Sequence, residues 1–285
     1  MIEARPSLTA MMVAKRRAAH QLFDARPLVL DDPFAVRIIG TEAEQELRAA
    51  ARKQQGVVAR SGRAMMVARS RFAETEMERA MARGVRQYVV LGAGLDTFAY
   101  RNPHPPHALR VFEVDHPATQ AWKRERLAAT GIRTPDNVTY AAIDFEHQTL
   151  AQGLRDVGFD AQAPAFFSWL GVTMYLSEDA IARTFAFIAA LPAGGGIALD
   201  YSLPDSSLSW VERLIRRYFA RKVARMGEPF RTHPTPEMMH SWLKRVGFHH
   251  IVDLGAEEFN KRYFQGRMDG LRIGGKSLRV VSAEI

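Results

Sequence analysis

Hydrophobic residues in the first 84 positions recur every three to four residues, which is the period of an amphipathic helix. The pattern predicts helices at 8–22, 33–40, 41–53 and 63–83. A capping box at Thr41–Glu44 marks one helix start, and Gly56 and Gly62 predict a break before the last helix. We expect this segment to cap a sheet or to cover a ligand.

From residue 87 onward, short apolar runs alternate with helical patterns, which is typical of a parallel sheet covered by helices. Strands are predicted at 88–91, 110–114, 138–143, 165–169, 197–201, 249–254 and 278–283. Helices are predicted at 117–129, 149–157, 177–191 and 236–246. An insertion at about 203–234 carries an amphipathic basic helix, which we expect to act as a lid.

The 285 residues can bury a large core, and the chain has no internal repeat and no low-complexity linker. We therefore predict one α/β domain. Its expected parts are a helical N-terminal cap at 1–84, a ligand-binding core at 85–202, a lid insertion at 203–245 and C-terminal strands at 246–285.

A glycine turn follows the first predicted strand. Gly92 lets the chain turn sharply, and Gly94 removes a side chain where a ligand approaches the backbone. A dinucleotide fingerprint needs a third glycine at the position of Thr97, and prolines from Pro103 onward break the helix that should follow. A ligand without a pyrophosphate, such as S-adenosylmethionine (SAM), fits this turn better than a dinucleotide.

Acidic residues end the next two predicted strands, at the sheet edge where open α/β sheets bind ligands. Asp115 lies 21 positions after Gly94 and can accept hydrogen bonds from both ribose hydroxyls, with Glu113 as the alternative. Asp144 can accept from an adenine amino group, and the backbone N–H of Phe145 can donate to the ring. Together with the glycine turn, these positions predict an adenosyl ligand.

Composition and charge limit the kinds of partner and cofactor that we expect. The net charge is +8, but the basic residues are dispersed and no nucleic-acid-binding motif is present, so we expect no nucleic-acid partner. No apolar run is long enough to span a bilayer and no signal peptide is recognisable, so we expect no membrane association. The absence of cysteine excludes thiolate sites and fits a cytoplasmic protein. No ligand spacing predicts a metal site, and the oligomeric state cannot be predicted.

Several motifs resemble one family. GAGLDT at 92–97, FEVDHP at 112–117, DF at 144–145 and GVTMYL at 171–176 resemble the leucine carboxyl methyltransferase family. The stronger likeness is to its bacterial branch of SAM-dependent O-methyltransferases, which includes polyketide carboxyl methyltransferases. The resemblance covers most of the chain and begins at DDPFA (31–35) and ARSRF (68–72). It implies a class I SAM-dependent methyltransferase fold, Rossmann-like, with a seven-stranded, mostly parallel sheet and a final antiparallel strand.

The resemblance also implies cofactor contacts. Gly92 and Gly94 would line the methionine part of SAM, Asp115 would bind the ribose, and Asp144 and Phe145 would hold the adenine.

Basic contacts to the cofactor are implied as well. Arg69 matches the family arginine that pairs with the SAM carboxylate, Arg71 is its rival, and Lys15 matches a second basic contact. One position departs from the pattern, because Leu170 stands where many members carry a glutamate. The carboxylate near the SAM amino group is therefore absent or supplied from elsewhere.

Methyl transfer from a sulfonium requires donor and acceptor to be held in line, away from water. A carboxylate acceptor is already ionised at neutral pH and needs no general base, whereas a hydroxyl needs one. The candidates for the acceptor pocket are Tyr175, Tyr201, His233 and His240. Arginines of the lid, Arg217 and Arg221 among them, are candidates for attracting an anionic acceptor.

The sequence therefore predicts a SAM-dependent O-methyltransferase that acts on a small molecule, at a carboxylate. Two alternatives stay open. One is an NAD-dependent oxidoreductase, and the other is a SAM-binding protein without catalytic activity, which the departure at Leu170 allows.

Overall fold

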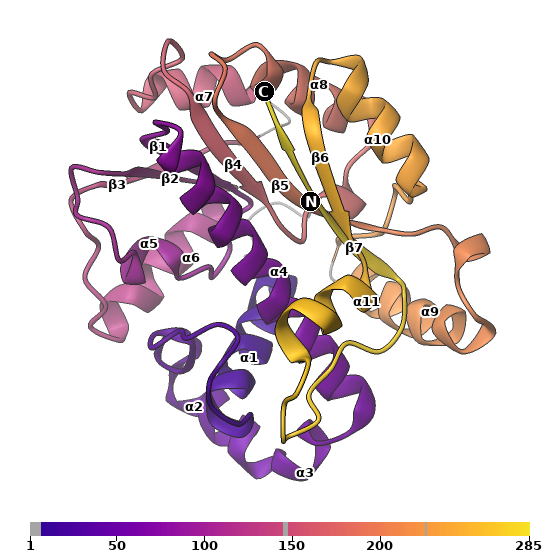
Figure 1. Ribbon diagram of the computed structural model, residues 1–285. Helices are drawn as coiled ribbons and strands as arrows, with labels where there is room; N and C mark the ends of the chain where they lie inside the picture. The colour runs from indigo at the N-terminus through magenta and orange to yellow at the C-terminus, as the bar shows by residue number, and fades with distance from the viewer. Residues whose placement is uncertain (1–6, 145–147, 226) are drawn as a thin grey trace.

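A seven-stranded sheet organises the computed structural model, which describes residues 7–144, 148–225 and 227–285 (Figure 1). The strands are β1 Gln87–Leu91, β2 Arg110–Asp115, β3 Val138–Ala142, β4 Ala165–Trp169, β5 Gly196–Ser202, β6 His249–Leu254 and β7 Leu278–Glu284. Their order is β3-β2-β1-β4-β5-β7-β6. Strand β7 is antiparallel to both of its neighbours, and the other pairs are parallel. The predicted sheet with its final antiparallel strand is thus confirmed.

Helices cover both faces of this sheet. The N-terminal group is α1 Leu8–Phe23, α2 Ala35–Ala49, α3 Ala51–Gln54 and α4 Val57–Ala82. Those that follow are α5 Phe98–Arg101, α6 Pro117–Ala129, α7 Leu150–Asp156, α8 Glu178–Ala189, α9 Trp210–Ala224, α10 Pro236–Arg245 and α11 Ala256–Phe259. Short turns complete the set: η1 Thr173–Tyr175, η2 Asp205–Ser207 and the π-helical η3 Asn260–Phe264. Among the described residues, none of the helices combines the length and hydrophobicity that a membrane-crossing segment needs.

Figure 1 shows α1, α2 and α3 gathered below the sheet, with α4 running from them along it. The predicted break between Gly56 and Gly62 is wrong, because α4 begins at Val57 and continues through Gly62. Glycine suits this position, since an added Cβ would lie 3.2 Å from Cζ of Arg16. The predicted helix end at Gly40 is instead a kink inside α2, where Gly40 has a φ of 79°.

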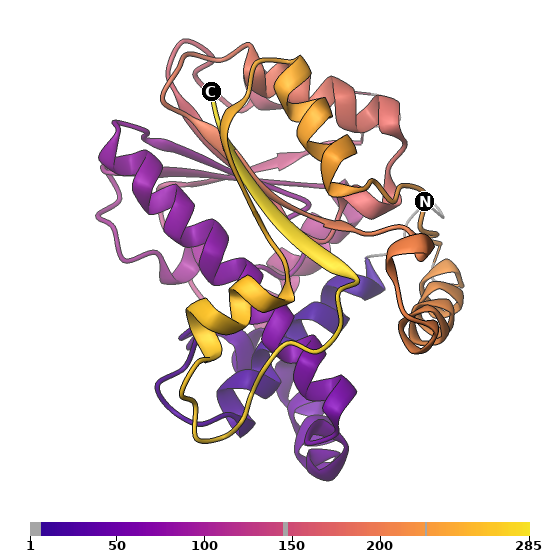
Figure 2. The same cartoon turned by 45° about the vertical axis from the view of Figure 1, so that its right-hand side comes forward.

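The core has two layers because side chains alternate along each strand. Val89 and Leu91 of β1 point into an apolar cluster that includes α8 and α10, whereas Tyr88 and Val90 point into one that includes α1, α2 and α4. A third cluster packs Phe72 of α4 against α11 and η3. The lid helix α9 lies apart from the sheet in both ribbon views (Figures 1 and 2).

A buried charge cluster joins α1 to α4. The Asp24 carboxylate accepts hydrogen bonds from Arg63 Nε at 2.7 Å and Nη2 at 2.6 Å, and its Oδ2 lies 2.7 Å from Nδ1 of His20. Arg63 is only 1% exposed, so water cannot replace this pairing. Burial on its own would raise the pKa of Asp24, but the hydrogen bonds from His20 and Arg63 hold it below its ordinary value.

We expect Asp24→Asn to lower the free energy of unfolding by about 3 kcal/mol at pH 7, because it leaves a buried guanidinium without its counter-charge. The folded-state pKa of Asp24 is depressed, so the stabilisation is present above the ordinary carboxyl pKa and is lost as pH falls through the folded-state value. The gap between variant and wild type should therefore narrow in acid. Urea unfolding at several pH values measures both effects.

The matched control is Glu44→Gln, which breaks the surface pair with Arg48 and should cost less than about 0.5 kcal/mol. Equal losses in the two variants would contradict a structural role for the buried cluster.

Candidate active site

A cavity of about 1520 Å³ opens at the carboxyl ends of β1, β2 and β4. Helices α1, α4, α7, α8 and α9 contribute other walls, together with the segments 227–231 and 273–278. Small-molecule sites usually occupy about 300–1,000 Å³, so this cavity has room for a cofactor and a second molecule together. Among the predicted site residues, it is lined by Arg69, Gly92, Gly94, Asp115, Asp144 and Tyr175.

The glycine turn after β1 forms the floor of the cavity. The N–H groups of Gly92 and Ala93 both donate to the carbonyl of Val114, at 2.8 and 3.0 Å. Gly92 and Gly94 have φ values of 66° and 45°, which disfavour any side chain. An added Cβ would lie 2.4 Å from Val172 Cγ2 at the first glycine. At Gly94 it would lie 2.9 Å from the Cβ of Ala10, so the second glycine also lets α1 approach the turn.

Asp115 ends β2 beside this turn. Its Oδ2 accepts from the N–H of Gly94 at 2.5 Å, and its Oδ1 accepts from the N–H of His116 at 2.7 Å. Burial raises the pKa of Asp115, and the two backbone hydrogen bonds oppose that rise. Each carboxylate oxygen keeps a further lone pair for a ligand hydroxyl. The alternative, Glu113, points elsewhere, because it lies 2.8 Å from Nζ of Lys123 and does not line the cavity.

The predicted adenine pair is only partly visible. Asp144 lines the cavity just after β3. Phe145 lies outside the described residues.

Arg69 reaches the cavity from α4 and is 5% exposed. Its Nη1 donates to the Asp200 carboxylate on β5, and the other oxygen of that carboxylate accepts from the N–H of Gly171 at 2.5 Å. Nε of Arg69 is buried without a partner among the described residues, so the guanidinium retains donor capacity. The rival Arg71 does not line the cavity. Sequence reasoning missed Asp200, although a single carboxylate inside an apolar strand was the available signal.

Leu170 lines the cavity and packs against two apolar clusters, so it supplies no charge there. Other carboxylates do line the wall. Asp96 Oδ2 accepts from Arg17 Nη1 at 2.9 Å, and Glu228 Oε2 accepts from the Thr9 hydroxyl at 2.6 Å. The departure from the family pattern at Leu170 therefore does not leave the cavity without acidic groups.

Lys15, predicted as a second basic contact to the cofactor, does not lie at the cavity. Its Nζ pairs with Glu46 Oε2 at 2.6 Å on α2, and it does not line the cavity. Its neighbour Arg16 does, because successive helical residues point about 100° apart. Among the described residues Arg16 has no hydrogen bond or ion pair, and its Cζ lies 5.6 Å from the Phe219 ring on α9. Burial, and then the nearby Arg69, lower the pKa of Arg16.

Of the four candidates for the acceptor pocket, only Tyr175 lines the cavity. Tyr175 lines the cavity and stacks on Phe230, with ring centroids 5.5 Å apart. Tyr201 and His240 instead belong to a cluster outside the cavity, where both bond Oδ2 of Asp253, at 2.6 and 2.9 Å. Long-range contacts between β5, α10 and β6 set this arrangement, so the structure does not support an acceptor role for either.

His233 does not line the cavity either, and its ring packs edge-on against Phe230. Burial, followed by the charge of Arg216, lowers its pKa, so burial disfavours the imidazolium form.

Among the described residues, the segment after the glycine turn lacks the long helix N-terminus that holds a dinucleotide pyrophosphate. Helix α5 after the glycine turn has only four residues, and the Thr97 hydroxyl before it donates to Asp32 Oδ2 at 2.6 Å. Thr97 is fully buried and so cannot contact a ligand phosphate.

Comparison with known proteins decides between the remaining alternatives. The profile of the leucine carboxyl methyltransferase family matches residues 10–189, which is more than half of the chain. This chain belongs to the leucine carboxyl methyltransferase family. Two relatives bear names that class them as S-adenosyl-L-methionine-dependent methyltransferases. YktD of Bacillus subtilis is 30% identical over 288 residues, 93% of each chain, and a Mycobacterium marinum protein is 35% identical over 230 residues, 77% of this chain and 72% of its own.

Solved structures confirm the fold of this family member along its whole length. A DUF574 family protein from Streptomyces avermitilis has a TM-score of 0.56 and 16% identity, and covers 100% of this chain and 99% of its own. A protein from Thermobifida fusca, described as a methyltransferase, has a TM-score of 0.55 and 17% identity, and covers 99% and 96%. The chain is thus a SAM-dependent methyltransferase with the class I fold, and the oxidoreductase alternative is wrong.

We expect Asp115→Ala in this methyltransferase to weaken binding of S-adenosylhomocysteine at least about 100-fold. If Asp115 binds the ribose as predicted, the change removes two charge-assisted hydrogen bonds to ribose hydroxyls, each worth about 1.5–3 kcal/mol. Isothermal titration calorimetry measures the loss, and circular dichroism checks the fold. The exposed Asp136→Ala serves as the control. Wild-type affinity in a folded Asp115→Ala protein would rule out the ribose role.

Proposed function

We propose that this enzyme transfers the methyl group of SAM to a carboxylate on a small, largely apolar molecule. The observation that carries the proposal is Arg16, a cation without a counter-charge among the described residues, inside a cavity large enough for two molecules. A partly desolvated guanidinium that lacks a partner favours an anionic ligand, and a carboxylate matches its planar fork.

The cavity divides into a polar and an apolar part. Around the glycine turn and Asp115 it offers backbone and carboxylate groups suited to the adenosyl and methionine parts of SAM. Toward α9 and the start of α4 its lining gains apolar residues, Met12, Val58, Met65, Ile215 and Phe219, beside the polar Ser61, Glu212 and Arg216. Arg16 lies at Phe219 in the apolar part. An acceptor with a hydrophobic body and one carboxylate satisfies both features.

The reaction asks little acid–base chemistry of the protein. Bound SAM supplies an electrophilic methyl group, and a carboxylate acceptor needs no deprotonation at neutral pH. Burial raises the pKa of Tyr175, so this phenol stays protonated and can donate a hydrogen bond to an acceptor oxygen. Arg16 and Tyr175 would orient the acceptor, while α1 and α9 would exclude water.

The arginines of the lid helix α9 are poorer candidates for attracting an anionic acceptor than the sequence suggested. Arg217 and Arg221 are exposed and do not line the cavity. Arg216 does line it, but its guanidinium is bound to the Leu203 carbonyl and to Asp205. Arg183, Arg231 and Lys276 also line the cavity but are exposed, so the partly buried Arg16 is our candidate for attracting an anionic acceptor. We expect the reaction to take place in the cytoplasm, since the chain has no cysteine that an oxidising compartment would pair.

The test compares Arg16→Met with Arg217→Met, a surface change of the same type. Turnover is followed as release of S-adenosylhomocysteine, with fatty and aromatic carboxylic acids each paired with the corresponding alcohol. We expect acids, not alcohols, to be methylated, and Arg16→Met to raise the KM for the acid about 10- to 100-fold, because one charge-assisted hydrogen bond is lost. Arg217→Met should match wild type.

The affinity for S-adenosylhomocysteine separates the two anions that Arg16 could bind. Unchanged affinity in Arg16→Met supports an acceptor role, whereas a large loss assigns Arg16 to the cofactor carboxylate. Methylation of the alcohols with no turnover of the acids would overturn the carboxylate proposal.

A further inference from the structure

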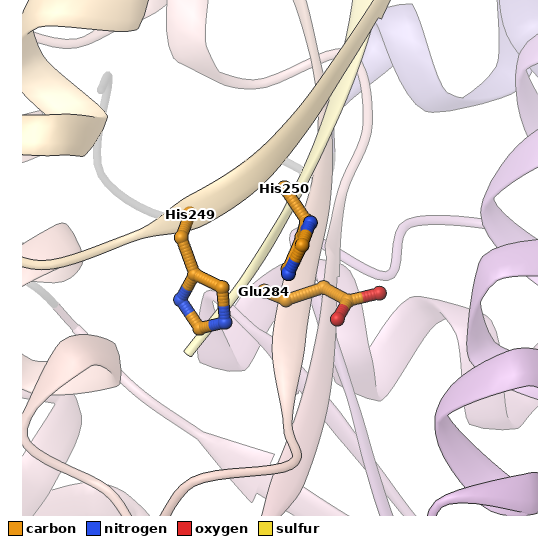
Figure 3. A group of neighbouring side chains, drawn as sticks. All are labelled: His249, His250 and Glu284. Atoms are coloured by element: carbon orange, nitrogen blue, oxygen red, sulfur yellow. The ribbon is translucent and has the colours of Figure 1, made fainter.

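We propose that His249, His250 and Glu284 form a binding site for a divalent transition-metal ion such as zinc (Figure 3). The nitrogen and oxygen ligand atoms of these three residues all lie within 4.8 Å of one another. None of the three lines the cavity. The site is therefore separate from methyl transfer, and the proposal does not depend on the identity of the acceptor.

Two strands bring the three side chains together. His249 begins β6, and in the strand register it lies opposite Glu284, which ends β7. The cavity lies at the carboxyl ends of the parallel strands, and β6 runs in the same direction as β5. The start of β6 is consequently at the opposite end of the sheet from the cofactor.

The backbone at His250 is the unusual feature of this cluster. Successive side chains of a regular strand point to opposite faces, so adjacent histidines would not normally share a ligand. Here the β6–β7 register shifts between His249 and Val252, and His250 has a φ of 47°. The two imidazole rings are consequently 4.8 Å apart between centroids.

This conformation has an energetic cost. A residue other than glycine in the left-handed region costs on the order of 1–3 kcal/mol, and such strain tends to occur at functional sites. Both histidines are exposed, and neither imidazole hydrogen-bonds to another described residue. A bound ion would give both rings a partner.

The chemistry of the ligand atoms restricts which metal ions the site would bind. Two imidazole nitrogens and one carboxylate oxygen suit zinc, nickel or copper, whereas magnesium and calcium prefer oxygen ligands alone. Ligand atoms around tetrahedral zinc lie about 3.4 Å apart, from Zn–N distances of about 2.0–2.1 Å. The side chains must therefore close by about 1.5 Å, which exposed rotamers can do. Exposure also leaves the remaining coordination positions to water.

One cation already lies at the site. Arg83 Nη1 pairs with Glu284 Oε1 at 3.0 Å, and this pair is about one-third exposed. A carboxylate can accept from more than one partner, so Arg83 does not block a metal ion, but its charge repels one. Removal of the Arg83 charge should therefore tighten metal binding, which a purely structural ion pair would not predict.

The consequence concerns stability. β6 is one of the two edge strands of the sheet, and its bulge interrupts the pairing with β7 close to the end of β7. An ion held by both strands would fasten this edge in place, since a ligand that binds only the folded state stabilises it.

The experiment titrates the full chain with zinc chloride and with magnesium chloride by calorimetry, and follows the melting temperature. His250→Asn is the central variant, because asparagine tolerates a positive φ but lacks the imidazole. We expect zinc, not magnesium, to bind and raise the melting temperature. His250→Asn and Glu284→Gln should each weaken zinc binding at least about 10-fold, and Arg83→Met should strengthen it.

The matched control is His107→Asn, an exposed histidine in the turn before β2, which should bind zinc as wild type does. Affinity for S-adenosylhomocysteine should be unchanged in all four variants, which confirms that they are folded. The proposal is overturned if zinc does not bind, or if His250→Asn and His107→Asn bind it equally.

Discussion

The hydrogen bond from Gly94 N–H to the Asp115 carboxylate is the contact on which the site depends. It ties the end of β1 to the end of β2 and fixes the glycine turn between them. A charged acceptor on a backbone donor is among the stronger hydrogen bonds, and here it holds a segment with two positive-φ glycines. The same carboxylate faces the cavity, so one group shapes the turn and remains available to a ligand.

The N-terminal cap depends on the same turn. Arg17 of α1 is 2% exposed, and it donates to the carbonyl of Leu95 and to the carboxylate of Asp96. Three consecutive residues of α1 thus have different partners among the described residues: Lys15 pairs at the surface, whereas Arg16 and Arg17 both line the cavity and only Arg17 is paired, with Asp96. The helix wall of the cavity and the loop of the sheet are therefore held as a unit, which preorganises the site.

The two ends of the sheet differ in chemistry. The carboxyl ends of the parallel strands carry the cavity, because the glycine turn, Asp115 and Asp144 lie at or just after the ends of strands that run in one direction. The start of β6 carries exposed imidazoles beside a bulge. A ligand at one end can stabilise the sheet without entering the site at the other.

The sequence by itself determined the strands, most of the helices and the cavity residues that directly follow strands. Each of these depends on a local pattern, such as the apolar run before Gly92 or the carboxylate at Asp115. Only the tertiary structure decided what depends on distant partners. Lys15 forms an ion pair with Glu46, and Tyr201 and His240 both hydrogen-bond to Asp253. Helix α4 continues through Gly62, which packs against Arg16. Period and composition report which face of an element is buried, but not which residue from another element meets it there.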